Sequence, residues 1–166
     1  MDCSGDAGTP VYCSFELNGK FFSDLECGGV GRFPAFSGDG ATRNDPRFVS
    51  RVDEGPLPRG RYYIFDRQSG GRLGWLYNKA SRVFGVDQER WFSLYRDDEV
   101  IDDWTFVRHI RRGSFRLHPI GPGALSKGGV VLQYQVQFDW LSAALKCTLP
   151  MVLADGSRAY GVLQVR

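Results

Sequence analysis

The sequence predicts a single, mainly β domain with one or two short helices. Its 166 residues are enough for one domain to bury a core without stapling by disulfides or metals. The 21 glycines and 8 prolines repeatedly interrupt short segments of alternating polarity, a pattern typical of strands joined by turns. Hydrophobic residues make up 42% of the chain and charged residues 24%, as in ordinary globular proteins.

The clearest hairpin signal lies near the N-terminus. Residues 11–17 (VYCSFEL) alternate in polarity, and an Asn-Gly pair follows them directly. Because Asn-Gly between two apolar runs favours a tight turn, residues 20–25 are expected to return antiparallel. Residues 28–40 are rich in glycine and are expected to form a loop around a short strand. Residues 42–55 are polar and are expected to be irregular.

Further strands are expected at residues 61–67, 73–76, 91–95, 104–110, 114–118 and 130–138. Alternation within residues 130–138 (VVLQYQVQF) would place their apolar side chains on one face of a sheet. Residues 141–146 (LSAALK) have the composition of a short helix. An Asp-Gly pair between residues 152–154 and 160–165 predicts a final hairpin.

Charge and hydropathy indicate that neither nucleic acid nor a membrane is an expected partner. The 21 basic residues are nearly balanced by 19 acidic ones, and the net charge of +2 does not predict a nucleic-acid partner. No apolar run is long enough to cross a bilayer, so no membrane span is expected. Residues 1–6 have neither the basic start nor the apolar stretch of a Sec-type signal. Secretion would therefore depend on another apparatus.

The chain has four cysteines, Cys3, Cys13, Cys27 and Cys147. Four cysteines allow three complete pairings, and the sequence does not choose among them. Three lie in the first 27 residues, which fits either an N-terminal disulfide formed in an oxidising compartment or a set of reduced, partly buried thiols. Because no Cys/His cluster has the spacing of a zinc site, neither a metal nor another cofactor is expected.

The run from residue 115 to residue 132 has the layout of a His-assisted thiol site. A strand ends at His118, a Gly/Pro-rich loop follows, and the turn SKGG from Ser126 to Gly129 leads into a second strand. In such sites a thiolate attacks a carbonyl and the imidazole moves the proton. Backbone N–H groups around Gly128 would bind the oxyanion. The thiol is missing, because Gly129 stands at the nucleophile position.

Each candidate side chain also has a structural interpretation. His118 is the candidate acid–base group, and its alternative is a buried histidine with a purely structural role. Ser126 is interpreted as a hydroxyl that stabilises the turn, since it stands three residues before the nucleophile position and serine needs an aligned base. Cys147 is not expected to supply a substitute thiol. His109 lies in a basic stretch and is expected at the surface.

Two segments resemble the L,D-transpeptidase-like effector family of type VI secretion systems, the Tlde1-like and YkuD-related domains. The first, with Ser37-Gly38, Asn44 and residues 55–64 (GPLPRGRYYI), is similar to the family pattern SG…N…GP[IL]PxGxYxI. The second ends in FRLHP and SKGGV and is similar to FxLHPxGxxxxSxGC[IV]xL. The resemblance covers about residues 33–135 of a single domain, 1–166, in which residues 1–32 would form an N-terminal hairpin extension.

The resemblance implies a bacterial toxin domain that acts on peptidoglycan stem peptides in the periplasm of a target cell. Members are carboxypeptidases and exchange transpeptidases, and a cognate immunity protein is an implied partner. Their cysteine follows the SxG glycine directly, where this chain has Gly129. The glycine is either a deliberate inactivation or natural to a degenerate member. On such a domain Arg111, Arg112 and Arg116 could attract the carboxylates of a stem peptide, but they are equally interpreted as solvated residues. Trp104 could line the substrate groove, although aromatic residues at strand spacing are usually core residues.

Two functions therefore stay open. In one, the chain is an inactive form of a stem-peptide acyl transferase, and Gly129→Cys would restore activity. In the other, the chain is naturally non-catalytic and binds a peptidoglycan stem or an immunity protein. A hydrolase that uses other residues is less favoured.

Overall fold

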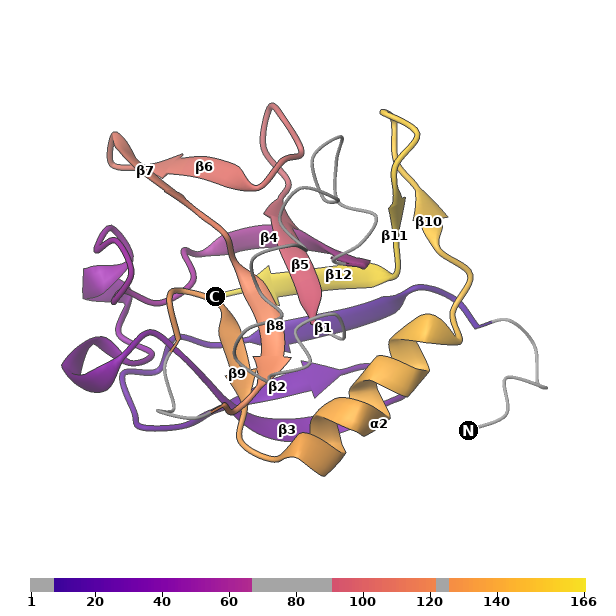
Figure 1. Cartoon of the computed structure of the whole chain (residues 1–166), viewed down its shortest axis with the longest axis horizontal. Helices are drawn as coiled ribbons and strands as arrows, with labels where there is room; N and C mark the ends of the chain where they lie inside the picture. Colours follow the sequence, from indigo (N-terminus) through magenta and orange to yellow (C-terminus); the bar gives the residue numbers. More distant parts are fainter. Residues whose placement is uncertain (1–7, 67–90, 122–125) are drawn as a thin grey trace, which may run out of the picture.

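The computed structural model describes residues 8–66, 91–121 and 126–166, and within them eight strands close a barrel (Figure 1). Their order around the barrel is β1-β12-β4-β5-β8-β9-β3-β2. The bounds are β1 Val11–Phe15, β2 Ser23–Cys27, β3 Gly31–Ser37, β4 Gly60–Asp66, β5 Phe92–Arg96, β8 Arg116–Pro119, β9 Val130–Leu132 and β12 Gly161–Val165. The pairs β1–β12 and β8–β9 are parallel and the other neighbours are antiparallel. The mainly β, single-domain prediction is confirmed.

Alternation along the strands separates the inside of the barrel from its outside. In β1, Val11, Cys13 and Phe15 are buried, whereas Tyr12 between the first two is 58% exposed. The inward side chains of the other strands join them in one continuous apolar cluster. Each large apolar side chain buried in this way contributes roughly 1.5–3 kcal/mol to folding. The barrel is therefore a packed core, and binding sites must be sought on its outer surface.

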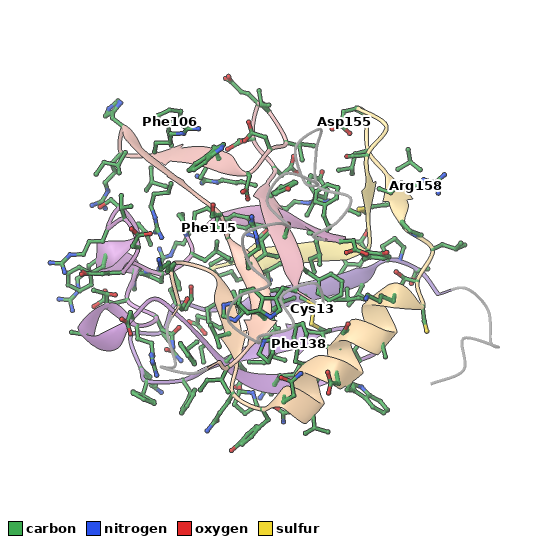
Figure 2. The ribbon with its side chains drawn as sticks, viewed as in Figure 1. Cys13, Phe106, Phe115, Phe138, Asp155 and Arg158 are labelled. Carbon is green, nitrogen blue, oxygen red and sulfur yellow. A yellow bond between two sulfur atoms is a disulfide. The ribbon has the colours of Figure 1, made fainter. Side chains whose placement is uncertain are left out.

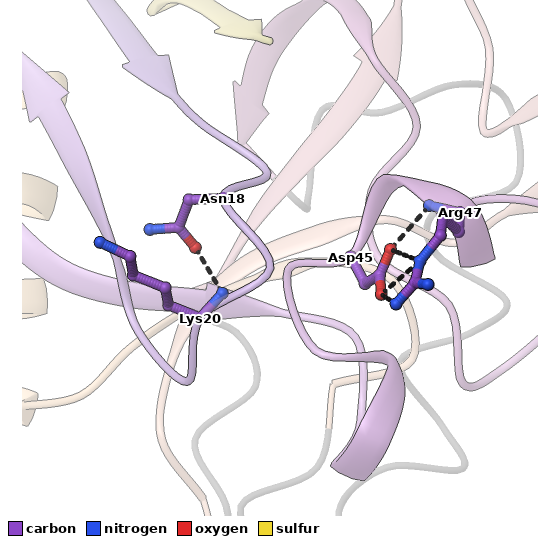
Figure 3. A network of polar contacts seen from close by, with 4 residues as sticks. All are labelled: Asn18, Lys20, Asp45 and Arg47. Carbon is purple, nitrogen blue, oxygen red and sulfur yellow. Dashed lines mark hydrogen bonds and ion pairs between the residues drawn. The ribbon is translucent and has the colours of Figure 1, made fainter.

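The N-terminal hairpin forms as predicted, with a longer turn. β2 pairs antiparallel with β1 but begins at Ser23, so the connection exceeds the two residues of the Asn-Gly pair. Asn18 instead accepts a hydrogen bond from the backbone N–H of Lys20 at 2.9 Å, and Gly19 has φ +67° (Figure 3). Asn side chains commonly stabilise turns through such local bonds. Both strands of this hairpin belong to the barrel.

A disulfide joins the first two strands. Cys13 and Cys27 are directly opposite in the register of β1 and β2, and their sulfur atoms are bonded. Cys147, at the end of the helix, is also disulfide-bonded. Cys3 lies outside the described residues. Of the two alternatives left open by the sequence, the structure shows the oxidised one.

The helix α2, Gln135–Lys146, corrects the strand expected over residues 130–138. The strand β9 ends at Leu132, and the predicted helix 141–146 is only the second half of α2. Alternation in the sequence was misleading because Val136 is 73% exposed. Apolar residues at helical spacing are buried instead, and they are Phe138, Leu141 and Leu145. This stripe packs the helix against the barrel beside β8 and β9 (Figure 1).

Two small hairpins lie outside the barrel order. The strands β6 (Trp104–Val107) and β7 (Ile110–Gly113) form one of them, so the single strand expected over 104–110 is split by a turn. The strands β10 (Met151–Val152) and β11 (Arg158–Ala159) form the other.

The final hairpin was therefore predicted with the wrong partner. Residues 160–165 were expected to pair with 152–154, but β12 lies between β1 and β4 in the barrel. The Asp-Gly turn does form, and it connects β10 to β11 instead. Residues 160–165 pair within the barrel because this buries Leu163 and Val165 in the core, whereas Val152 of the expected partner strand is 66% exposed.

The irregular segment 42–55 contains one 3₁₀ turn, η2 (Pro46–Phe48), and a similar turn, η1 (Gly40–Thr42), precedes it. Asp45 caps η2: its carboxylate accepts hydrogen bonds from the backbone and the guanidinium of Arg47 (Figure 3). These bonds hold the pKa of Asp45 below its usual value. The segment expected as a loop around a short strand, 28–40, contains the seven-residue strand β3. The strand expected at 73–76 falls outside the described residues.

None of the helices in the described part of the chain is both long and apolar enough to cross a bilayer.

Candidate active site

The parallel strands β8 and β9 bring the histidine and the SKGG turn together. Leu117 pairs with Val130, and His118 pairs with Val131. Gly129 lies against the backbone of Arg116, two residues before His118 on the neighbouring strand. Because side chains alternate along a strand, the His118 and Arg116 side chains share the face opposite the core residue Leu117. The two halves of the sequence motif thus meet on the outer face of the barrel.

Two contacts fix the imidazole of His118. Its Nδ1 lies 2.8 Å from the carbonyl oxygen of Pro119, and its ring stacks on Trp91 with centroids 4.3 Å apart and planes 19° apart. A carbonyl only accepts hydrogen bonds, so Nδ1 carries the proton and the neutral ring has its lone pair on Nε2. Nε2 is therefore the nitrogen that would take or give a proton. Trp91 thus supports the imidazole ring.

Two serine hydroxyls hold the carbonyl oxygen of Gly129. The hydroxyl of Ser37 donates to it at 2.7 Å, and that of Ser126 donates at 2.9 Å. In turn, the N–H of Leu57 donates to Ser37 at 2.7 Å and the N–H of Gly38 donates to Ser126 at 3.2 Å. Both serines are buried. Ser126 is thus a turn-stabilising hydroxyl, as its position in the sequence indicated, and it connects the turn to β3.

Asn44 extends this network to the N-terminal hairpin. It is completely buried, with a positive φ of 54°. Its Oδ1 accepts from the N–H of Ser37 at 2.8 Å, and its Nδ2 donates to the carbonyl of Lys20 at 2.9 Å. Buried polar groups that are satisfied in this way specify a unique local structure. The SG…N part of the sequence motif therefore acts by positioning the SKGG turn.

Arg112 supports the turn from the other side. It was expected either to attract stem-peptide carboxylates or to be solvated, but it is only 3% exposed. Its guanidinium donates to the carbonyl oxygens of Val49, Pro56 and Gly55 at 2.5, 2.7 and 2.9 Å. Burial lowers the pKa of this guanidinium below its ordinary value. No local signal in the sequence reveals this role, because the three carbonyls lie 56 to 63 residues away along the chain.

Gly128 and Gly129 have no room for side chains. Gly128 has φ +99°, and a Cβ built on it would lie 2.2 Å from Nη2 of Arg112. A Cβ on Gly129 would lie 2.1 Å from the carbonyl oxygen of Arg116. Real Cβ atoms do not approach other atoms closer than 3.0 Å. A cysteine at position 129 therefore requires the backbone of β8 or β9 to move, which counts against the simple restoration of activity expected for Gly129→Cys.

The other residues expected to contact the stem peptide are Arg116, Arg111 and Trp104, and the structure places them at different sites. Arg116 is on the His118 face, but its guanidinium forms an ion pair with Asp103 at 2.6 and 2.9 Å. Arg111 stacks over the ring of Trp104 at 3.9 Å on the β6–β7 hairpin. Arg111 and Arg112 are consecutive in β7, so they point to opposite faces. The structure therefore brings Arg116 to the site, and leaves Arg111 and Trp104 on a face turned away from Gly128.

A shallow cavity of about 600 Å³ lies elsewhere, on the outer surface of β1, β2, β12 and β4. In the closed strand order, β8 is on the opposite side of the barrel from β1. The lining includes Tyr12, Gln164 and three arginines, but no residue of the His118 site. Two of these arginines, Arg32 and Arg61, already contact carboxylates.

On the outer face of the barrel, the histidine near the end of β8 thus lies beside the Ser-x-Gly turn that leads into the parallel strand β9. The family model of the Tlde1 domain matches residues 31–155. The chain therefore belongs to the Tlde1 domain family, the effector family that its motifs resemble. No curated protein gives a significant match.

Proposed function

We propose that this domain is a peptidoglycan-targeting effector domain that binds stem peptides without cleaving them. The observation that carries the proposal is the tight packing of Gly129 against Arg116, at the position where the family motif has its nucleophile. Without that thiol we expect no acyl-enzyme, because no thiol among the described residues stands at the nucleophile position. The two hydroxyls that contact Gly129, on Ser37 and Ser126, both donate to its carbonyl oxygen.

The features that would hold a substrate remain. The imidazole of His118 is fixed by its hydrogen bond and its aromatic stack. Ser37 and Ser126 hold the SKGG turn through the carbonyl of Gly129, and the guanidinium of Arg112 lies against Gly128. Such pre-organisation lowers the entropic cost of binding. A stem carbonyl would accept hydrogen bonds from the turn or from His118, and it would then be released unchanged.

The disulfide supports an extracytoplasmic site of action. Cys13–Cys27 closes the β1–β2 hairpin inside the core, and such bonds persist in oxidising compartments such as the bacterial periplasm. We propose the periplasm of a target cell as the site of action. An immunity protein is the second proposed partner.

Binding is tested by co-sedimentation of the purified chain with peptidoglycan sacculi. The two histidines provide a matched pair: His118→Gln alters the proposed site, and His109→Gln alters an exposed turn. We expect His118→Gln to weaken binding about tenfold or more and His109→Gln to leave it unchanged, with thermal unfolding as the folding control. Failure of the unaltered chain to bind, or equal binding by both variants, would overturn the proposal.

A further inference from the structure

The β6–β7 hairpin presents an aromatic and basic face to solvent. In its register Phe106 is opposite Arg111, and Trp104 is opposite Gly113, so these side chains share one face. Phe106 is 67% exposed and Trp104 is 43% exposed. Figure 2 shows Phe106 on the hairpin at the periphery of the molecule. Large apolar side chains exposed next to one another are a mark of interaction surfaces.

The opposite face anchors the hairpin rigidly. Thr105 donates to Asp98 at 2.7 Å, and Arg96 donates to Thr105 at 3.3 Å. Arg112 is bound to three backbone carbonyls of the 49–56 segment. The N–H of Ser114 donates to the carbonyl of Asp103. The exposed face is therefore pre-organised, and a ligand would not have to order it on binding.

The two exposed arginines of this hairpin, Arg108 and Arg111, form no ion pair with a carboxylate of the described residues. Arg108 and His109 form the turn, and their φ values are 50° and 66°. Asn and Gly are the residues usually found at such positive φ values in a two-residue hairpin turn. Arg111 stacks on Trp104. Among the ion pairs of the described residues, none includes Arg108 or Arg111, whereas Arg47 and Arg116 are both paired. The hairpin thus carries positive charge that a partner can neutralise.

We infer that the β6–β7 hairpin is a docking element for a partner protein with an acidic, apolar-lined groove. Phe106 and Trp104 are the apolar anchors, and Arg108 and Arg111 bind carboxylates at the groove rim. Aromatic residues and arginine are the types that dominate the binding energy of protein interfaces. The face points away from Gly128, so partner docking is separate from stem-peptide binding. Each of the two proposals can therefore be refuted without refuting the other.

The probe is a phage-displayed library of random peptides, selected against the full chain. The variant Phe106→Ser/Arg111→Gln removes one exposed apolar side chain and one positive charge. The variant Val152→Ser/Arg158→Gln is its matched control, because it makes the same kinds of change on the exposed β10–β11 hairpin. Thermal unfolding of both variants controls for folding.

We expect enriched peptides to combine Asp or Glu with apolar residues and to bind the β6–β7 variant at least tenfold more weakly than the unaltered chain and the β10–β11 variant. Their affinity should fall as salt is raised. Enriched peptides without acidic residues, or equal binding to both variants, would overturn the inference. Loss of sacculus binding in the β6–β7 variant would also overturn it, because the face would then bind peptidoglycan. A dimer of the chain that this variant abolishes would overturn it as well, because the face would then be a contact between two copies.

Discussion

The tight packing around Gly129 predicts that even a methyl group is not tolerated there. The Cβ of Gly129→Ala would lie 2.1 Å from the carbonyl oxygen of Arg116, 2.9 Å from its nitrogen and 3.0 Å from its carbonyl carbon. Ordinary contacts begin at 3.4 Å, so the oxygen must move by the difference between 3.4 and 2.1 Å, about 1.3 Å. The obstacle is backbone, which cannot rotate away as a flexible side chain does.

The strand that must move is held on both sides. β8 is hydrogen-bonded to β5 and β9, and its Leu117 is fully packed in the core. Overpacking of well-packed sites typically costs about 1–3 kcal/mol and occasionally more, and we expect a backbone obstacle to lie at or above the upper end of this range. We therefore expect Gly129→Ala to lower the free energy of unfolding by about 2–4 kcal/mol. Gly129→Cys should lower it by at least as much.

The assay is urea unfolding, with Gly121→Ala as the matched control. A Cβ on Gly121 would meet no atom of the described residues within 4 Å, so this variant should stay within about 0.5 kcal/mol of the unaltered chain. Equal stability of the two variants would show that position 129 accommodates a side chain. The argument that glycine belongs to this backbone would then be refuted.

Two further predictions concern stability. Burial raises the pKa of Tyr62, which donates to the carbonyl of Pro58 at 2.7 Å, well above its ordinary value of 10.0. Above pH 10 the folded state keeps a proton that the unfolded chain releases, so this contribution to stability is complete below pH 10 and declines above it. Tyr62→Phe should therefore make the free energy of unfolding fall less steeply with pH on the alkaline side. An unchanged dependence on pH would contradict this. Reduction of Cys13–Cys27 should lower the free energy of unfolding by about 3 kcal/mol, because the two cysteines are 14 residues apart in the sequence. The measurement is the melting temperature of the Cys3→Ala/Cys147→Ala variant with and without dithiothreitol. A melting temperature that dithiothreitol does not change would contradict that figure.

Local sequence signals located most strands but failed where two periodicities compete. Residues 130–138 alternate in polarity, and they also contain the start of a helical stripe that continues to Leu145. The stripe prevails because Phe138 and Leu145 are both buried against the barrel, whereas Val136 is exposed. Likewise the Asp-Gly turn was recognised, but the strand that follows it was assigned to the wrong partner because pairing in a closed barrel is non-local.

The candidate site was predictable in its motif and not in its support. His118 and the SKGG turn are recognisable in the sequence by their order and spacing, and the parallel pairing of β8 and β9 brings them close together. The support depends on distant contacts. Ser37 reaches the carbonyl of Gly129 across 92 residues, and Arg112 reaches Gly55 across 57. The absence of space at Gly129 is a property of the folded backbone, and no pattern of residues reports it.

The most direct measurement is mass spectrometry of purified muropeptides incubated with the unaltered chain. Binding without chemistry predicts that every stem peptide is recovered intact, with no D-amino acid released or exchanged, under conditions in which the chain co-sediments with sacculi. Release or exchange of a D-amino acid that disappears in His118→Gln would contradict the account, because a nucleophile other than the missing thiol would then have to act beside that imidazole.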